Sequence, residues 1–456
     1  KNFFINIIDI RYIGHLRYYQ NISLINIHFS VYILFYIGLS NNNTNNLANA
    51  FIYFLIFDDK HSAYLRSKTV LIGVPKEIKN LEYRIGLTPV GVAELVKRGH
   101  HVLVQKDGGA GIGFRDDQYQ KAGAEIIGTP QEIFKRAELV VKVKEPQPSE
   151  CEMLRPGQTL FAYLHLAPDL EQAKLLIESG ATCIAYETVT DSAGGLPLLA
   201  PMSEIAGRMS AQEGAFCLEK THGGNGILMG GVPGVEPANV LIIGGGVVGL
   251  NAARVAIGMG AKVTIIDLSL TRLKQIDDLL GNSVSTLYST TETIGQQLMV
   301  SDLVIGAVLI PGATAPKLVT RSMLKLMKPG SVLVDVAIDQ GGCFETSKAT
   351  THENPTYVVD GIIHYCVANM PGGVARTSTL ALTNATMPFV IALSGQGTHN
   401  ALRNDAHLLK GLNVHNGMLT LKTVADSLGY GYVDPAHALE SDIFKNKAST
   451  GKQVVA

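Results

Sequence analysis

The sequence has few residues that could hold the chain together covalently. It contains five cysteines, an odd number, and none forms a Cys-x-x-Cys pair. We therefore expect small buried thiols in a reducing compartment and not a disulfide framework. These residues are Cys151, Cys183, Cys217, Cys343 and Cys366.

An excess of charge of one sign is also absent. The formal net charge is −1 over 456 residues, so no basic surplus can neutralise phosphates, which argues against nucleic acid as a partner. No His-Glu-x-x-His or nucleophile-elbow motif occurs, so nothing supports a metalloprotease or a serine hydrolase, and no metal site is predicted. After residue 68 no segment is long and apolar enough to span a membrane. We therefore expect a cytoplasmic protein without a membrane partner.

Residues 1–68 differ from the rest of the chain. They are rich in Asn, Ile, Phe and Tyr, and no charged residue occurs from Tyr18 to Phe57. The stretch Ile22–Ser40 approaches the length of a membrane span, but polar residues interrupt it and it lacks the cleavage pattern of a signal peptide. Three interpretations stay open: an AT-biased upstream stretch translated with the gene, a low-complexity extension, or a true anchor or targeting segment.

From Thr69 onward, short apolar runs alternate with helix-like stretches such as Pro89–Arg98, which Thr88 would cap. Continuous apolar strands that alternate with helices predict parallel sheets covered on both faces. Two such series occur, and 46% apolar residues suffice to fill two cores. The expected strands are Val70–Gly73, His101–Gln105, Leu139–Val143, Thr159–Leu164 and Thr182–Ala185, then Val240–Ile243, Lys262–Ile266, Asp302–Ile305, Ser331–Val336 and Thr356–Val359.

The second series begins with a dinucleotide-binding fingerprint. Gly244, Gly246 and Gly249 fit Gly-x-Gly-x-x-Gly directly after an expected strand and at the start of a helix rich in small residues. These glycines provide the tight turn, the room for a pyrophosphate and the close helix–strand contact. Asp267 ends the next strand, where its carboxylate can accept the ribose hydroxyls and would repel a 2′-phosphate. The pattern predicts a dinucleotide site that favours NAD over NADP.

We therefore predict an α/β protein with two Rossmann-like domains, doubly wound and mostly parallel sheets, and a cleft between them. The chain after Gly373 is mainly helical in pattern (Leu380–Leu393, Leu419–Leu428) and should return to the first domain. The predicted order is an extension (1–68), a discontinuous substrate and catalytic domain (69–197 with about 375–436), an NAD-binding domain (198–374) and a tail (437–456).

Catalytic candidates should lie at the carboxyl ends of strands. Lys142 and Lys144 are two apart on one expected strand and would share a face. His165 ends the run TLFAYLH and Asp339 follows SVLVDVAI; these residue types can move protons or orient water. Arg84 could bind a carboxylate through its guanidinium. Each residue also has an ordinary structural interpretation as a solvated strand end, a packed histidine, a turn carboxylate or a solvated arginine.

The span from about Val70 to Asp434 resembles the alanine dehydrogenase family. The motifs that carry this resemblance are GVPKEIKNLEYRIGLTP (73–89), VKVKEP (141–146), LHLA (164–167), PLLAPMSEIAGR (197–208), GGVPGVEPANVLIIGGG (230–246), SDLVIGAVLIPGATAPKLV (301–319), VDVAIDQGGCFE (334–345) and YCVANMPGGVARTSTLALTNATMP (365–388). Several are long and unusual, so the resemblance is specific. Residues 1–68 fall outside it.

The resemblance assigns roles to the candidates. It implies that Arg84 and Lys144 hold pyruvate, that His165 and Asp339 are catalytic, and that the protein is a hexamer of two-domain subunits. The coenzyme contacts that it implies, beyond the fingerprint glycines and including Asp339 again, are Ser203, Asp267, Arg272, Ser289, Val308, Leu309, Val336, Ala337, Ile338, Asp339, Val367, Ala368, Asn369 and Met370.

The implied reaction is the reversible, NAD-dependent oxidative deamination of L-alanine to pyruvate and ammonia, with hydride transfer from the alanine Cα. The main alternative is the NAD(H)-binding component of a proton-translocating nicotinamide nucleotide transhydrogenase, which shares the fold and parts of the sequence. A lysine-forming saccharopine dehydrogenase agrees less well with the motifs. The combination of Lys144, His165 and Asp339 within alanine dehydrogenase motifs favours the first interpretation.

Overall fold

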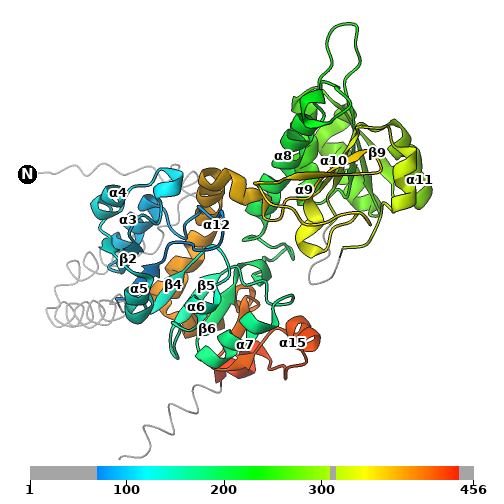
Figure 1. The fold of residues 1–456 in the computed structure, drawn as a ribbon. Coiled ribbons are helices and arrows are strands. Elements are labelled where there is room, and N and C mark those ends of the chain that lie inside the picture. Colours follow the sequence, from blue (N-terminus) through cyan, green and yellow to red (C-terminus); the bar gives the residue numbers. More distant parts are fainter. Residues whose placement is uncertain (1–68, 309–314, 441–456) are drawn as a thin grey trace, which may run out of the picture. The chain divides into compact units, whose positions relative to one another are not determined.

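The computed structural model describes residues 69–308 and 315–440. The predictions for residues 1–68, for Leu309 and for the tail beyond residue 440 lie outside this part of the chain. Within it, two sheets carry helices on their faces (Figure 1). This arrangement confirms the predicted α/β class with two mostly parallel sheets.

The first sheet has the strand order β15-β14-β6-β5-β4-β1-β2-β3. Strands β1 to β6 pair in parallel, whereas β14 is antiparallel to both of its neighbours. The chain therefore leaves this sheet after β6 and returns to it after building the second one. Its strands are β1 (Leu71–Val74), β2 (His101–Gln105), β3 (Glu125–Ile127), β4 (Leu139–Val141), β5 (Thr159–Ala162), β6 (Thr182–Ala185), β14 (Leu412–His415) and β15 (Met418–Leu419).

The second sheet has the order β12-β13-β11-β10-β7-β8-β9, and only β12 runs antiparallel to its neighbour. The strand order reverses at β7, which lies between β8 and β10; such a switch point is where open α/β sheets bind ligands. The strands are β7 (Asn239–Ile243), β8 (Lys262–Asp267), β9 (Val284–Tyr288), β10 (Leu303–Gly306), β11 (Val332–Asp335), β12 (Thr356–Val359) and β13 (Ile362–Tyr365).

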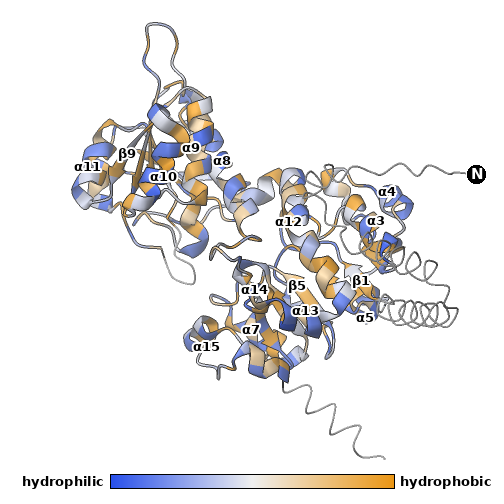
Figure 2. Ribbon diagram, turned by 180° about the vertical axis from the view of Figure 1, so that it is seen from behind, coloured by the Kyte–Doolittle hydropathy of each residue, from blue (hydrophilic) through white to orange (hydrophobic). Residues whose placement is uncertain are grey.

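Local sequence explains where the helices begin. Helix α3 starts at Pro89, and the Thr88 hydroxyl accepts a hydrogen bond from the Gly91 amide, as predicted. Figure 2 shows β5 as a hydrophobic strand, whereas the helices carry both hydrophobic and hydrophilic residues. The helices are α3 (Pro89–Lys97), α4 (Asp116–Lys121), α5 (Pro130–Arg136), α6 (Pro148–Cys151), α7 (Leu170–Ser179), α8 (Ala200–Cys217), α9 (Val247–Gly258), α10 (Leu270–Leu280), α11 (Thr291–Val300), α12 (Ala375–Gln396), α13 (Thr398–Asn404), α14 (Ala406–Leu409) and α15 (Lys422–Leu428).

Several of the structural predictions were wrong in detail. The strand expected over Thr159–Leu164 ends at Ala162, three residues before His165, and the strand expected over Ser331–Val336 ends at Asp335. The strand expected over Leu139–Val143 ends at Val141, so Lys142 and Lys144 do not project from a shared strand face. The stretch Leu419–Leu428 is not helical throughout, because Leu419 ends β15 and the helix starts at Lys422.

The cysteines agree with the prediction: all five are buried and free. In the described ranges, no helix has both the length and the apolar character needed to cross a membrane.

Candidate active site

The candidate residues of the first sheet lie beyond the carboxyl ends of neighbouring parallel strands. Lys144 follows β4 and His165 follows β5, while Arg84 lies between β1 and α3. In the second sheet, Asp339 lies in the short 3₁₀ helix Val336–Gln340, directly after β11. The sheet topology therefore places them where ligands of α/β proteins bind.

Arg84 is buried and ion-paired, so the interpretation as a solvated loop arginine was wrong. Its Nε and Nη2 donate to the two carboxylate oxygens of Glu82 at 2.7 and 2.5 Å. Burial alone would raise the pKa of Glu82, but the guanidinium outweighs that effect and holds the pKa below its ordinary value. Nη2 also donates to Asn369 Oδ1 at 2.8 Å, and Nη1 lies 3.2 Å from Met202 Sδ. Glu82 was not singled out from the sequence.

The two lysines have different surroundings. Lys142 is fully buried, and its ammonium lies 3.0 Å from Glu77 Oε2 and 2.7 Å from Glu150 Oε1. Glu77 Oε1 also accepts from the backbone N–H of Lys144, at 3.4 Å. The Lys144 ammonium lies 3.8 Å from Glu145 Oε2. Lys142 therefore belongs to a buried ionic cluster, and Lys144 stays the candidate for substrate binding.

His165 is held in an unusual backbone conformation. Its φ is 49°, in the left-handed region that side chains other than glycine seldom adopt. The Glu187 carboxylate accepts its backbone N–H at 2.7 Å and lies 4.0 Å from its Nδ1. The imidazole stacks on Tyr163 with centroids 5.7 Å apart, and 43% of the side chain is exposed. A strained, half-exposed histidine fixed by a carboxylate suits proton transfer.

Asn369 connects two of the candidates. Its backbone N–H donates to Asp339 Oδ1 at 3.4 Å, while its side chain accepts from Arg84 and donates to Glu82 Oε2 at 3.1 Å. Its own φ is 57°. The structure therefore brings Arg84 and Asp339 to one residue. Among the described residues, no hydrogen bond joins Lys144 or His165 to that group.

The glycine-rich turn after β7 fits a dinucleotide. Gly244 has a φ of 104°, and a Cβ on Gly249 would lie 1.9 Å from the Gly244 carbonyl oxygen. Neither position has room for a side chain. At Gly246, which precedes α9, a Cβ would meet nothing within 4 Å. This opening at a helix N-terminus is where a pyrophosphate would approach.

Three of the predicted coenzyme contacts, Asp267, Arg272 and Ser289, lie at or next to that turn. Asp267 Oδ2 accepts from the Gly245 N–H at 2.7 Å, and its backbone oxygen accepts from Ser289 N at 3.0 Å. The Arg272 Nε donates to the Gly245 carbonyl at 2.5 Å. Each Asp267 oxygen has two lone pairs, so the carboxylate can fix the turn and still accept from a ribose.

The remaining predicted coenzyme contacts follow the carboxyl ends of strands in the second sheet, except Ser203, which lies on α8. Val308 follows β10, and the segments 336–339 and 367–370 follow β11 and β13. Within residues 69–308 and 315–440, no cluster of three or more His, Cys, Asp or Glu side chains could hold a metal ion.

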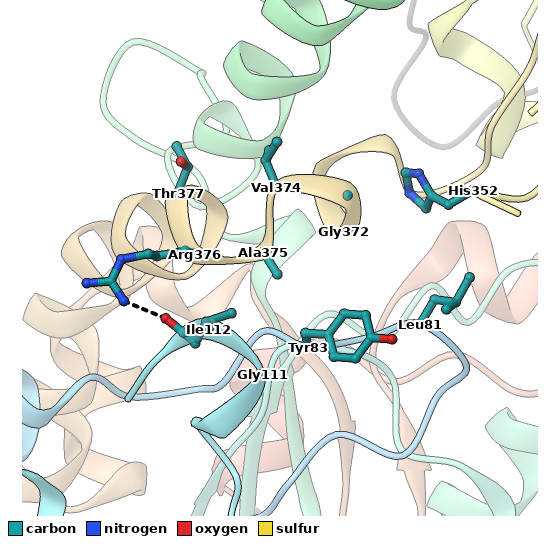
Figure 3. A pocket seen from close by; sticks show the side chains of 11 residues that line it. Leu81, Tyr83, Gly111, Ile112, His352, Gly372, Val374, Ala375, Arg376 and Thr377 are labelled. Atoms are coloured by element: carbon teal, nitrogen blue, oxygen red, sulfur yellow. Dashed lines mark hydrogen bonds between the residues drawn. The ribbon is translucent and has the colours of Figure 1, made fainter. Parts of the chain in front are cut away.

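A cavity of about 610 Å³ is lined by Leu81 and Tyr83, which flank Glu82 in the sequence. None of the proposed catalytic and substrate-binding residues lines it. Tyr83 lies between Glu82 and Arg84 in the sequence, and its side chain faces this cavity (Figure 3). On its other side Arg376 donates to the Ile112 carbonyl at 2.5 Å. The lining residues are Leu81, Tyr83, Gly111, Ile112, His352, Gly372, Gly373, Val374, Ala375, Arg376 and Thr377.

Comparison with known proteins agrees with this architecture. Residues 73–206 match the family described as alanine dehydrogenase/PNT, N-terminal domain, and residues 210–422 match its C-terminal domain. The chain is 60% identical over 365 residues to the alanine dehydrogenase of Halomonas elongata, covering 80% of this chain and 98% of that protein. An L-alanine dehydrogenase structure matches with a TM-score of 0.76 and 50% identity, covering 79% of this chain and 99% of the other. A transhydrogenase from Sinorhizobium meliloti matches with a TM-score of 0.66 and 26% identity, covering 77% and 99%.

Proposed function

Because the chain belongs to the alanine dehydrogenase/PNT family, we propose that it catalyses the reversible oxidative deamination of L-alanine to pyruvate and ammonia with NAD. The geometric observation that carries the proposal is the position of Asn369, which contacts both Arg84 and Asp339. An arginine suited to a substrate carboxylate and a carboxylate suited to water or ammonia thus contact the same residue, which belongs to a segment proposed to bind the coenzyme. We also propose a homohexamer that works in the cytoplasm, in keeping with the family resemblance.

Each residue has a defined task in this proposal. Arg84 and Lys144 bind the substrate carboxylate and polarise the carbonyl oxygen, which supplies orientation and charge stabilisation. His165 moves a proton at the carbonyl or hydroxyl oxygen, and Asp339 orients the water or ammonia that adds at the α-carbon. NAD⁺, when bound, accepts the hydride from the alanine Cα.

The second sheet would hold the coenzyme. The open position at Gly246 and the N-terminus of α9 suit the pyrophosphate. The Asp267 carboxylate suits the ribose hydroxyls and opposes a 2′-phosphate by like-charge repulsion. These features support NAD over NADP.

The test is direct. Purified protein mixed with NAD⁺ and L-alanine should produce reduced nicotinamide, and with NADH, pyruvate and ammonia it should consume it. D-alanine and NADP⁺ serve as matched controls and should give much lower rates. Inactivity with L-alanine, together with exchange of reducing equivalents between NAD(H) and NADP(H) when a partner is added, would replace this proposal with the transhydrogenase alternative.

A further inference from the structure

A buried carboxylate organises the turn that follows β11. Asp335 ends this strand and has no exposed surface. Its Oδ1 accepts from the Ala337 N–H at 3.1 Å, and its Oδ2 accepts from the N–H groups of Cys343 and Phe344 at 2.9 and 3.3 Å. The Ser347 hydroxyl donates to the same Oδ2 at 2.5 Å. One carboxylate thus holds both ends of the segment from Ala337 to Phe344.

Lys317 holds the same segment through its carbonyl groups. Its ammonium donates to the backbone oxygens of Gly341, Gly342 and Phe344 at 2.5, 2.8 and 3.2 Å. Charged groups of opposite sign therefore satisfy the donors and the acceptors of one turn. Hydrogen bonds to charged groups are roughly twice as strong as neutral ones, so this turn is held more firmly than an ordinary loop.

The packing of the turn depends on Asp335 as well. Gly342 has a φ of 75°, and a Cβ built on it would lie 2.6 Å from Asp335 Oδ2. The backbone at Gly342 therefore approaches the carboxylate as closely as only glycine allows.

Asp339 lies within the segment Ala337–Phe344, in the 3₁₀ helix between Asp335 and Gly341. We propose that Asp335 and Lys317 are positioning residues that hold the Asp339 carboxylate at the reacting α-carbon, an inference that rests on the proposed alanine dehydrogenase function. The backbone contacts of Asp335 and Lys317 given above all go to this segment, and the Ser347 hydroxyl binds the Asp335 carboxylate from just beyond it. Their effect on the reaction passes through the backbone of the turn.

The experiment compares four variants. Lys317→Met removes the ammonium but keeps the apolar stem, and Lys317→Arg keeps a cationic donor. Asp335→Asn replaces an acceptor oxygen with an NH₂ group that faces backbone donors. Asp302→Asn is the matched control, because Asp302 is an equally buried carboxylate of the same sheet that accepts from Asn239 N at 2.9 Å, but it precedes β10 at the amino end of the strand.

We measure kcat and KM with L-alanine at saturating NAD⁺, the Kd of NADH by fluorescence, and the melting temperature. Lys317→Met should lower kcat roughly 10–100-fold, the scale of a small misplacement of a catalytic group, while KM for alanine changes little because Arg84 and Lys144 are untouched. Lys317→Arg should restore most of the lost turnover. Asp335→Asn should lower kcat at least as much as Lys317→Met does. Asp302→Asn should lower the melting temperature but not kcat.

Lys317 is exposed, so its variants keep the proposal testable even if Asp335→Asn fails to fold. A kcat of Lys317→Met within about twofold of the unaltered protein, or equal losses of kcat in Asp302→Asn and Lys317→Met, would overturn the proposal, since even a small misplacement of a catalytic group lowers the rate by roughly 10–100-fold. If the unaltered protein binds NADH but does not oxidise alanine, the proposed function fails. The positioning role of Asp335 and Lys317 is then tested by NADH affinity, and an unchanged Kd in Lys317→Met overturns that role.

Discussion

The buried cluster of Lys142, Glu77 and Glu150 allows a quantitative prediction of stability. All three side chains are 0–2% exposed, and the ammonium lies 3.0 and 2.7 Å from the two carboxylates. Replacing Lys142 with Met keeps much of the side-chain volume but leaves two carboxylates buried without a cation. Removal of one partner from a buried ion pair destabilises a protein by about 3–5 kcal/mol. We expect Lys142→Met to lower the free energy of unfolding by that amount near neutral pH.

An exposed ion pair of equal length provides the control. The Lys262 ammonium lies 3.0 Å from Glu236 Oε1, but these side chains are 53% and 82% exposed. Exposed pairs contribute about 0–1 kcal/mol, so Lys262→Met should have little effect. Because the distance is the same as between Lys142 and Glu77, a difference between the two variants reports burial together with the second carboxylate, Glu150, and not the length of the ion pair.

The loss in Lys142→Met should depend on pH. Burial raises the pKa of the Glu77 carboxyl even with Lys142 present, and removal of the cation raises it further. A carboxyl whose folded pKa is raised contributes stability below its unfolded pKa and loses that contribution as pH rises through the folded pKa. The deficit of the variant should therefore grow from mildly acidic to mildly alkaline pH.

Urea denaturation at a fixed protein concentration measures this effect, because the proposed assembly into hexamers would make stability depend on concentration. Lys142→Met, Lys262→Met and the unaltered protein are compared at a mildly acidic and at a mildly alkaline pH, because burial raises the pKa of the Glu77 carboxyl. The reasoning is refuted if Lys142→Met loses no more stability than Lys262→Met, or if its deficit is the same at both pH values.

Three further predictions concern the site. His165→Ala should lower turnover roughly 10²–10⁴-fold, as expected for a general acid–base residue, with little change in NAD⁺ affinity measured by titration; near-normal turnover would reduce His165 to a packed strand-end histidine. Gly249→Ala should disrupt the turn after β7, because its Cβ would lie 1.9 Å from a backbone oxygen, whereas Gly246→Ala should fold normally and weaken only coenzyme binding; circular dichroism and NADH titration separate the two, and equal behaviour would contradict the assignment. Asp267→Ala combined with a nearby arginine should weaken NAD⁺ and admit NADP⁺, and an unchanged preference in steady-state kinetics would show that Asp267 does not face the ribose.

The interior of each sheet could be predicted from the sequence because both faces of its strands are buried. The runs His101–Gln105 and Thr182–Ala185 were predicted with the bounds that the structure shows. The edge strand Thr356–Val359 was also predicted with its observed bounds, although none of its residues is buried. The strands β3, β9, β13, β14 and β15 were not predicted. In β13 the buried His364 interrupts the apolar pattern, and its ring nitrogens are satisfied by Thr346 Oγ1 at 2.7 Å and the Ile362 carbonyl at 3.0 Å. These tertiary partners remove the free-energy penalty of burying a polar side chain. They cannot be predicted from the local sequence pattern around His364.

The candidate site was predictable to the extent that it follows strand ends. Lys144, His165 and Asp339 all lie just beyond strands that the apolar runs revealed. The glutamates that bind the backbone of Lys144 and His165 were not predicted, because Glu77 and Glu187 are distant from these residues in sequence. The one usable signal was the charge of Asp335 inside the otherwise apolar run of β11, since a lone charge in a buried strand needs partners.

The pairing of Arg84 explains why the proposed substrate site needs a second cation. Nε and Nη2 already donate to Glu82. Nη1 lies against Met202 Sδ, which is a weak acceptor. Only Nη1 can therefore donate to a substrate without breaking a charge-assisted hydrogen bond. A substrate carboxylate can therefore gain one strong contact from Arg84 and not the two-point contact of an unpaired guanidinium. Since the buried Glu82 also neutralises the arginine, the attraction for an anion must come partly from elsewhere. Lys144, beyond the end of β4, is the cation that the proposed mechanism supplies for this purpose.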